Sequence, residues 1–189
     1  MELREVKLVI KNIPDFFADN GIEDFLTRIP LIQLEKQVSE LNKLAVVNFK
    51  DDQTNFSLVI TSQQIHLILK SLEQLSEALK IFDSMDEIIK KKLLVDFVIF
   101  SGVVNTDEGI DSYNSLLSKE PSDSIKVKML GVEFQSTNFE YKVSFNKHTN
   151  YTNINIKSLL QCGVNDTIQN TNDSYKELSV QFPKLSMFI

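Results

Sequence analysis

The side chains that do most protein chemistry are scarce in this chain, and their spacing matches no familiar catalytic or metal-binding motif. Histidine occurs only at His66 and His148, and Cys162 is the single cysteine. The spacings HxH, HExxH and CxxC are absent, so no zinc motif is present. We expect His66 on the outward side of a strand and His148 in a polar turn. Cys162 is expected to be a structural thiol, because nucleophilic catalysis needs an activating base that the sequence does not supply.

The sequence also lacks the motifs that bind phosphate groups or cofactors. The chain contains five glycines, and neither the dinucleotide-binding glycine motif nor the P-loop motif occurs. The acidic patches at residues 51–52 and 83–86 lack the spacing of an EF-hand loop. We therefore expect no cofactor and no metal, and the sequence favours a protein that is not an enzyme.

The most informative single residue is Asp96, which interrupts an almost continuously apolar run at residues 93–104. A carboxylate in such a strand must be ion-paired, hydrogen-bonded or placed where the strand faces a cleft. A structural, partnered acid is the preferred interpretation. The alternative is a ligand site, to which an acidic loop with Asp107, Glu108 and Asp111 would contribute, although solvated acids at a helix start explain that loop equally simply.

The elements that position these residues are clearest between Asn55 and Asn105. Alternating apolar residues predict strands at 56–61 and 65–70, because side chains in a strand point to opposite faces in turn. Ser71 with Gln74 has the spacing of a capping box and predicts one long amphipathic helix over about 71–92. Its apolar face is formed by Leu72, Leu75, Leu79, Phe82, either Met85 or Ile88, and Ile89. The apolar run 93–104 predicts a strand that is buried on both faces.

Similar patterns extend through the rest of the chain. Strands are expected at 5–11, 44–49, 125–134, 139–145 and 151–157. Helical spacing of apolar residues occurs at 22–29, 31–41 and 110–117, and a helix is expected to begin near Ser158. Residues 165–174 are polar and expected to be mobile. The fold class is therefore α+β, with an antiparallel or mixed sheet of two meanders packed against several helices.

The length of 189 residues suits one α+β domain over residues 1–189. The loop at 120–124 offers the alternative of two units, 1–119 and 124–189. The chain ends in the apolar residues Phe182, Leu185, Met187 and Phe188. This tail is expected either to fold back onto the domain or to dock on another chain, since exposed apolar patches are rare in monomers.

Charge and cysteine content narrow the partners and the compartment. The net charge is −6, and no basic cluster occurs beyond Lys90, Lys91 and Lys92, which argues against direct nucleic-acid binding. One cysteine permits no internal disulfide, and no apolar run suits a signal peptide or a membrane span. We expect a cytoplasmic protein without membrane contact. Arginine occurs only at Arg4 and Arg28, a bias typical of a low-GC bacterium or its phage.

The residues Leu3, Arg4, Glu5 and Val6 lead into a strand that is followed by a helix, a meander, a long helix and a strand ending near Asn105. This order resembles a sporadically distributed family of uncharacterised bacterial proteins over about the first 105 residues. It is more distantly similar to the SecB-like arrangement of an antiparallel sheet with long helices, from which it departs because its helices interrupt the meander early and its second meander comes late. Neither resemblance implies catalytic residues. Both imply binding and oligomerisation.

The sequence therefore predicts a protein-interaction module that binds a protein partner and self-associates, encoded by a phage or mobile element and directed at a host protein complex. One alternative is a small-molecule or nucleotide-binding protein, with weak hydrolase activity, that uses a cleft near Asp96. Another alternative is a SecB-like holdase, or an acidic mimic of nucleic acid.

Overall fold

The structure, a computed structural model, describes residues 1–19, 21–50, 55–105, 129–146 and 151–185. Its strands form one nine-stranded sheet in the order β2-β3-β4-β5-β1-β6-β9-β8-β7. Every pairing between neighbouring strands is antiparallel. The α+β class is therefore confirmed. β1 occupies the centre of the sheet. It lies between β5, the last strand of the meander β2–β5, and β6, which pairs in turn with β9 of the second meander.

Apart from β2, the strands agree with the strand segments expected from the sequence. They are β1 (Glu2–Lys11), β2 (Gln33–Ser39), β3 (Leu44–Lys50), β4 (Asn55–Thr61), β5 (Ile65–Leu69), β6 (Leu94–Asn105), β7 (Met129–Gln135), β8 (Phe139–Asn146) and β9 (Tyr151–Gly163). The helices are α1 (Gly21–Arg28), α2 (Leu75–Leu79), α3 (Glu87–Lys90) and α5 (Thr167–Leu185). Short 3₁₀ turns cover Leu72–Gln74, Lys80–Ser84 and Val164–Asp166.

The hydrophobic core lies between one face of the sheet and the helices. Alternate residues of β3, β4 and β5 are buried on this face, as are Val6, Leu8 and Ile10 of β1. The helical side of the core is closed by Phe25 and Leu26 of α1, by Phe82 of the 3₁₀ turn Lys80–Ser84 and by Leu178 of α5. The period of two in the strands therefore selects which residues are removed from water.

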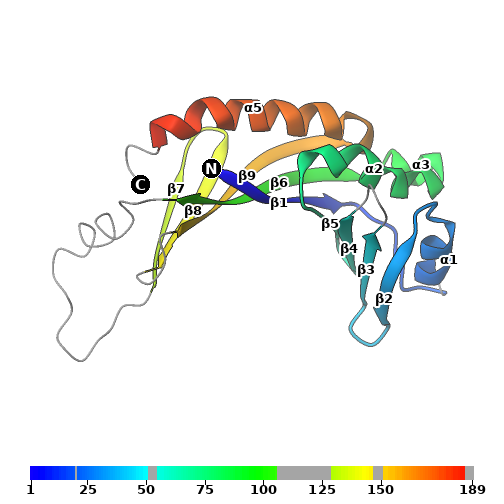
Figure 1. The fold of residues 1–189 in the computed structure, drawn as a ribbon. Coiled ribbons are helices and arrows are strands. Elements are labelled where there is room, and N and C mark those ends of the chain that lie inside the picture. The colour runs from blue at the N-terminus through cyan, green and yellow to red at the C-terminus, as the bar shows by residue number, and fades with distance from the viewer. Residues whose placement is uncertain (20, 51–54, 106–128, 147–150, 186–189) are drawn as a thin grey trace.

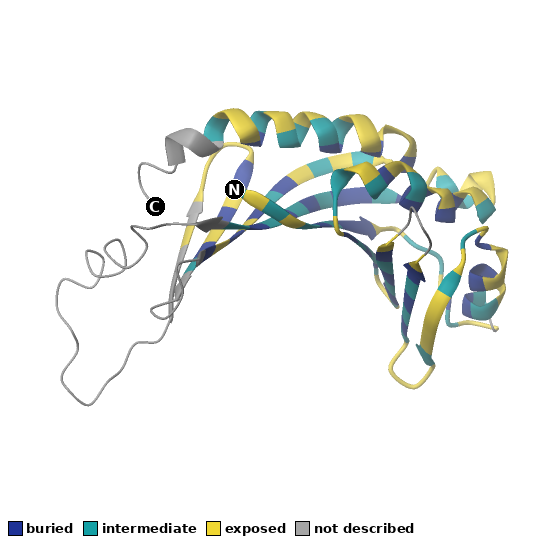
Figure 2. Ribbon diagram, in the orientation of Figure 1, coloured by how far each residue is buried: buried dark blue, intermediate teal, exposed yellow. Residues whose placement is uncertain are grey.

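The four helices of the described residues lie on the same side of the sheet. Figure 1 shows α5 running above β9 and the helices α1 to α3 gathered over the half that contains β2 to β5. The sheet arches beneath them, so the surface that no described helix covers is the inner side of the arch. Figure 2 shows buried and half-buried residues alternating along the strands of this arch. We call the uncovered surface the inner face, and it consists of the strand residues that point away from the helices.

The long helix expected over residues 71–92 is not present, and shorter helical pieces replace it. The chain becomes extended at Met85 (φ −85°, ψ 150°), and Asp86 then caps α3 by accepting a hydrogen bond from the Ile88 N–H at 2.8 Å. Ser84 donates its hydroxyl to the Ile81 carbonyl at 2.9 Å. Short polar side chains that bond to nearby backbone groups compete with the helix, and two of them flank Met85.

The helix expected at residues 31–41 is also wrong, because these residues form the edge strand β2. Their apolar residues do not share one face: Leu34 and Leu41 are 61% and 94% exposed, whereas Leu31 and Val38 are partly buried. Tertiary contacts favour the strand, since Val38 pairs with Ala45 and Gln33 donates to the Leu26 carbonyl of α1. Helical spacing of four residues was too weak to outweigh sheet pairing.

The C-terminal part corrects two further expectations. No helix begins near Ser158, because β9 continues to Gly163. The segment 165–174 forms the start of α5, which begins at Thr167. Thr167 and Thr171 are fully buried, and Ser174 accepts a hydrogen bond from Ser158 at 3.2 Å. At this end of α5 the residues that face the sheet are small and polar rather than apolar. Hydrophobic periodicity therefore did not reveal the helix. The expected helix at 110–117 and the loop at 120–124 lie outside the described residues.

Candidate functional site

The inner face carries a row of side chains that crosses six strands at right angles to their direction. Strand register places the members side by side: Val46 faces Val59, Val59 faces His66, His66 faces Val9, Val9 faces Phe97, and Phe97 faces Leu159. We call this row the central stripe. Five of its six members are apolar, and no described helix covers them.

Exposure varies along the central stripe. Val9 is only 2% exposed because its neighbours on β5 and β6 flank it, whereas Leu159 at the end is 61% exposed. Val46, Val59, His66 and Phe97 are half-buried. β6 was expected to be buried on both faces, but Phe97 and Ile99 on its inner side remain partly accessible. The inner face is therefore much more apolar than an ordinary solvated surface of an antiparallel sheet, which is usually polar.

A second row runs beside the central stripe, displaced by two residues along each strand. This border row contains Asn48, Ser57, Ile68, Lys7, Ile99 and Lys157. Ser57 donates to the Asn48 side-chain oxygen at 2.7 Å. Lys157 forms an ion pair with Glu140 at 2.9 Å and stands 4.8 Å from the centre of the Phe97 ring. Lys7 has no ion-pair partner in the part of the chain that the structure describes.

A hollow of about 520 Å³ lies over β6, β9, β8 and β7 on the inner face. Its polar lining is arranged as opposite charges on neighbouring strands: Lys157 with Glu140, and Lys142 with Glu133 at 2.6 Å. The ion pair with Lys142 is the main cause that lowers the pKa of Glu133. These charged groups neutralise one another, so the hollow presents no concentrated charge of either sign.

His66 lies in the middle of the central stripe, as a sheet-surface histidine. Its Nε2 atom is buried and has no hydrogen-bond partner among the described residues. Burial lowers the pKa of His66, and the nearby positive charge of Lys7 lowers it further. Because both influences disfavour the protonated ring, His66 is held in its neutral form near neutral pH.

Asp96 owes its position to an irregularity in strand pairing. Val9 and Ile10 of β1 pair with Phe97 and Val95, so Asp96 is an extra residue in β6, and the pairing with β9 shifts at the same place. A bulge of this kind re-aims a side chain within a strand. It explains how a carboxylate interrupts an apolar run while its neighbours Val95 and Val98 remain in the core.

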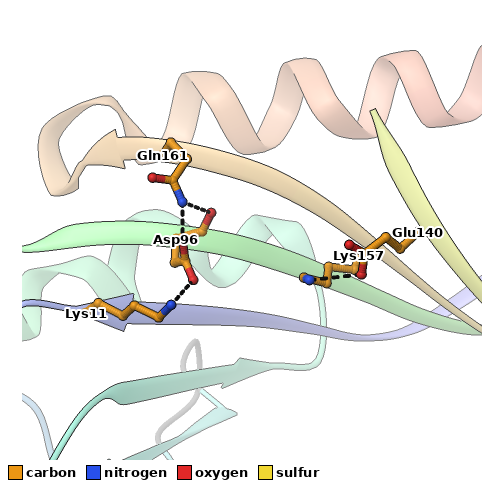
Figure 3. Close-up of polar contacts among 5 residues, drawn as sticks. All are labelled: Lys11, Asp96, Glu140, Lys157 and Gln161. Carbon is orange, nitrogen blue, oxygen red and sulfur yellow. Dashed lines mark hydrogen bonds and ion pairs between the residues drawn. The ribbon is translucent and has the colours of Figure 1, made fainter. Parts of the chain in front are cut away.

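Both oxygens of the Asp96 carboxylate have partners (Figure 3). The Lys11 ammonium lies 2.6 Å from Oδ2, and the Gln161 amide donates to Oδ1 and, at 3.5 Å, to the Asp96 carbonyl. Gln161 has a left-handed backbone (φ 48°), which belongs to the corresponding irregularity in β9. Asp96 is 8% exposed. The geometry therefore matches the structural alternative for Asp96: a partnered acid that joins β1, β6 and β9.

The other expected site residues are not brought to this place within the described residues. Asp107, Glu108 and Asp111 lie outside them, as do Met187 and Phe188 of the apolar tail. Phe182 and Leu185 fall within the bounds of α5. Burial raises the pKa of the Cys162 thiol, an effect partly offset by hydrogen bonding to Thr167, so Cys162 resembles a structural thiol. No group of three or more potential metal ligands occurs in the described ranges.

Sequence reasoning missed the inner face as a candidate site. The signal was present in the strands, where several residues between the core positions, among them Val46, Val59 and Phe97, are apolar rather than charged. Which of these residues adjoin one another depends on pairing between strands that are distant in the chain, and the sequence does not state that pairing.

Neither a comparison with models of protein families nor one with curated protein sequences found a match. Among the helices of the described residues, none combines the length and apolar character needed to cross a membrane.

Proposed function

We propose that this protein is a non-enzymatic interaction module that docks a partner polypeptide on the inner face of its sheet. The observation that carries the proposal is the central stripe, an apolar row across six strands that no described helix covers. Leu159 is exposed, and Val46, Val59 and Phe97 are half-buried. Accessible apolar patches of some extent are typical of protein-interaction sites.

The character of the surrounding side chains supports binding rather than turnover. The charged groups of the inner face are largely occupied with one another, as in the pairs Lys157–Glu140, Lys142–Glu133 and Lys11–Asp96. A general acid or base needs a free group with a pKa near the working pH. An apolar centre with a polar rim is instead the usual anatomy of a protein interface.

A polypeptide suits this surface better than a small molecule. Sites for small ligands enclose most of the ligand in a concave pocket. The central stripe extends across the width of the sheet, and Leu159 at its end is 61% exposed. Only a ligand as long as the stripe would remove most of its apolar surface from water.

Site-specific photocrosslinking in the organism that encodes the protein tests this proposal. A photoreactive phenylalanine analogue is placed at Val59 or Ile99 on the inner face, and at Lys176 on the exposed side of α5 as the control. We expect one abundant protein adduct from both inner-face positions, identifiable by mass spectrometry, and none from Lys176. The adduct should disappear in the variant Phe97→Lys.

Equal crosslinking from Lys176 and from the inner face would contradict the proposal, as would the absence of an adduct from either inner-face position. The thermal unfolding of Phe97→Lys must match that of the wild type for its loss of crosslinking to count. Val59→Lys provides a second substitution within the stripe.

Self-association is a second candidate, and the edge strand β2 is the observation that favours it. Ile32 and Leu34 are 66% and 61% exposed beside the outer edge of β2, and Leu41 at the following turn is 94% exposed. An uncovered edge strand offers unpaired backbone groups to another strand. Antiparallel pairing of two β2 strands about a two-fold axis would bury these apolar residues symmetrically.

Analytical ultracentrifugation tests self-association through β2. We expect the wild type to sediment as a dimer and Leu34→Lys to sediment as a monomer. Ile88→Lys is the matched control, because Ile88 on α3 is exposed to a similar degree, 67%, but is not part of the edge. A monomeric wild type, or equal dissociation by both substitutions, would reject this interface.

A further inference from the structure

The inner face restricts the secondary structure of a chain that lies on it. The backbone N–H and C=O groups of the inner strands are already used in the sheet, from β3 to β8. A segment resting on the face of the sheet therefore cannot pair with it and must satisfy its own backbone groups. An α-helix does so internally, whereas an extended segment leaves them without partners.

The length of the central stripe sets the length of such a helix. The stripe runs from β3 through β4, β5, β1 and β6 to β9. Five inter-strand spacings of about 4.8 Å give roughly 24 Å, which is the length of about 16 helical residues. The inner side of the arch is concave (Figure 1).

Polar groups on both sides of the central stripe match the flanks of an amphipathic helix. The border row presents Asn48, Ser57, Lys7 and Lys157 on one side, with Ile68 and Ile99 among them. On the other side, Lys11 lies with Asp96 and Gln161. An amphipathic helix has an apolar stripe with polar residues on its flanks. The arrangement is therefore complementary to one face of such a helix.

Lys7 determines the charge that this helix should carry. It stands between Ile68 and Ile99 in the border row and is half-buried. Within the described residues it forms no ion pair, and Glu5, the next residue of the same strand on this face, does not bond to it. The other two lysines beside the stripe, Lys11 and Lys157, are already paired with Asp96 and Glu140. An acidic side chain of the partner would supply the counter-ion that Lys7 lacks.

We infer that the partner segment is an amphipathic α-helix of about four turns that lies along the central stripe and places an acidic residue against Lys7. This inference rests on the proposed docking function and adds the conformation and charge of the ligand. Val59, Phe97 and Leu159, the accessible members of the stripe, contact its apolar face.

Synthetic peptides of about 16 residues, matched to the stripe length, test the inference by fluorescence anisotropy with the full-length protein. The first peptide is an amphipathic helix with leucine on one face and glutamate on the flanks. The second replaces glutamate by lysine, and the third has the composition of the first in an order without helical periodicity. We expect the acidic helix to bind about ten-fold tighter than either of the others, the difference that about 1.4 kcal/mol produces.

Charge reversal at Lys7 supplies the discriminating variant. Lys7→Glu should weaken binding of the acidic helix about ten-fold and improve binding of the basic helix, since one close charge pair changes sign. Lys176→Glu is the matched control, because it makes the same charge change on the exposed side of α5 and should change neither affinity. Unfolding curves of both variants verify that the fold is retained.

The outcomes separate the inference from the docking function. If all three peptides bind equally and Phe97→Lys abolishes their binding, the inner face docks polypeptides, but the inference that the partner segment is an acidic amphipathic helix is wrong. If Lys7→Glu and Lys176→Glu have equal effects, the assignment of the acidic contact to Lys7 is wrong. If no peptide binds, or Phe97→Lys leaves binding unchanged, both the inference and the inner-face docking function are rejected.

Discussion

At the scale of single residues, His66 links the inner face to pH. Its pKa lies below the ordinary value because of burial and the nearby Lys7, and its Nε2 atom has no hydrogen-bond partner in the described part of the chain. The unfolded chain therefore takes up a proton at a higher pH than the folded protein does. Stability is unaffected by this group above the unfolded pKa of about 6.5 and falls as the pH is lowered below it.

The measurement is urea unfolding at pH 7.5 and at pH 5.5. We expect the wild type to lose stability at the lower pH and His66→Gln to lose less. His148→Gln, which removes the other histidine of the sequence, provides the comparison. An unchanged pH dependence in His66→Gln would show that other groups cause the loss.

Asp96 supports a second prediction, which concerns structure rather than ligand binding. Asp96→Leu removes the acceptor of the Gln161 amide in a region that is 8% exposed, so we expect it to lower the free energy of unfolding by about 1–3 kcal/mol. Asp96→Asn preserves an acceptor and should cost less. Lys11→Met should cost at most about 1 kcal/mol, because the Lys11 side chain is 49% exposed.

Chemical denaturation of Asp96→Leu, Asp96→Asn and Lys11→Met measures the loss of unfolding free energy in each variant and so tests the expected order. Equal stability of Asp96→Leu and the wild type would remove the structural role assigned to Asp96. It would revive the ligand-site alternative, to be examined by binding measurements on the same variant.

At the scale of elements, the close approach of β1 and β6 depends on Gly102. A Cβ atom at this position would lie 2.6 Å from the Glu2 carbonyl oxygen and 2.7 Å from the Met1 side chain. Gly102→Ala must therefore displace the start of β1, and we expect a loss of about 1–3 kcal/mol in unfolding free energy. Hydrogen exchange should show reduced protection at the N-terminal end of β1.

Gly163→Ala is the matched control for this element. The nearest atom to its added Cβ would be the Asp166 carboxylate at 4.0 Å, and its φ of −69° suits any residue. We expect a change within about 0.5 kcal/mol. If both alanine variants are equally stable, contact with β1 does not explain the glycine at position 102.

At the scale of the whole molecule, the described helices cover one face of the sheet and leave the inner face, which we propose as the docking surface, without a helix over it. Two adjacent residues of β3 lie on opposite faces of the sheet. Val47 is 0% exposed on the helix side, and Val46 is half-buried on the inner face. Val47→Thr should cost about 1–3 kcal/mol, since it buries a hydroxyl among apolar side chains. Val46→Thr should cost clearly less.

Thermal and urea unfolding of this pair measure the asymmetry directly. If Val46→Thr proves as destabilising as Val47→Thr, the inner face is part of the core and is not free for a partner. The two substitutions are chemically identical and adjacent, so only the face of the sheet distinguishes them.

Local periodicity was sufficient for most strands, because alternation of exposed and buried residues is a property of a few consecutive side chains. The segments 44–49, 56–61, 65–70 and 139–145 were recognised in this way, as was the helix at 22–29. The same method failed at 71–92 and 31–41. There, hydrogen bonds from Ser84 and Asp86, and pairing of Val38 with β3, outweighed a helical spacing that was itself correct.

By itself the sequence determined the α+β class, the alternation within the strands and the need of Asp96 for a partner. Only the tertiary structure decided which partner that is, because Lys11 and Gln161 are brought to Asp96 by pairing between β1, β6 and β9. The central stripe arose in the same way. Val9, Val59 and Phe97 lie far apart in the chain, and their adjacency follows from strand register and from the helices covering one face of the sheet, which are long-range properties that local patterns do not contain.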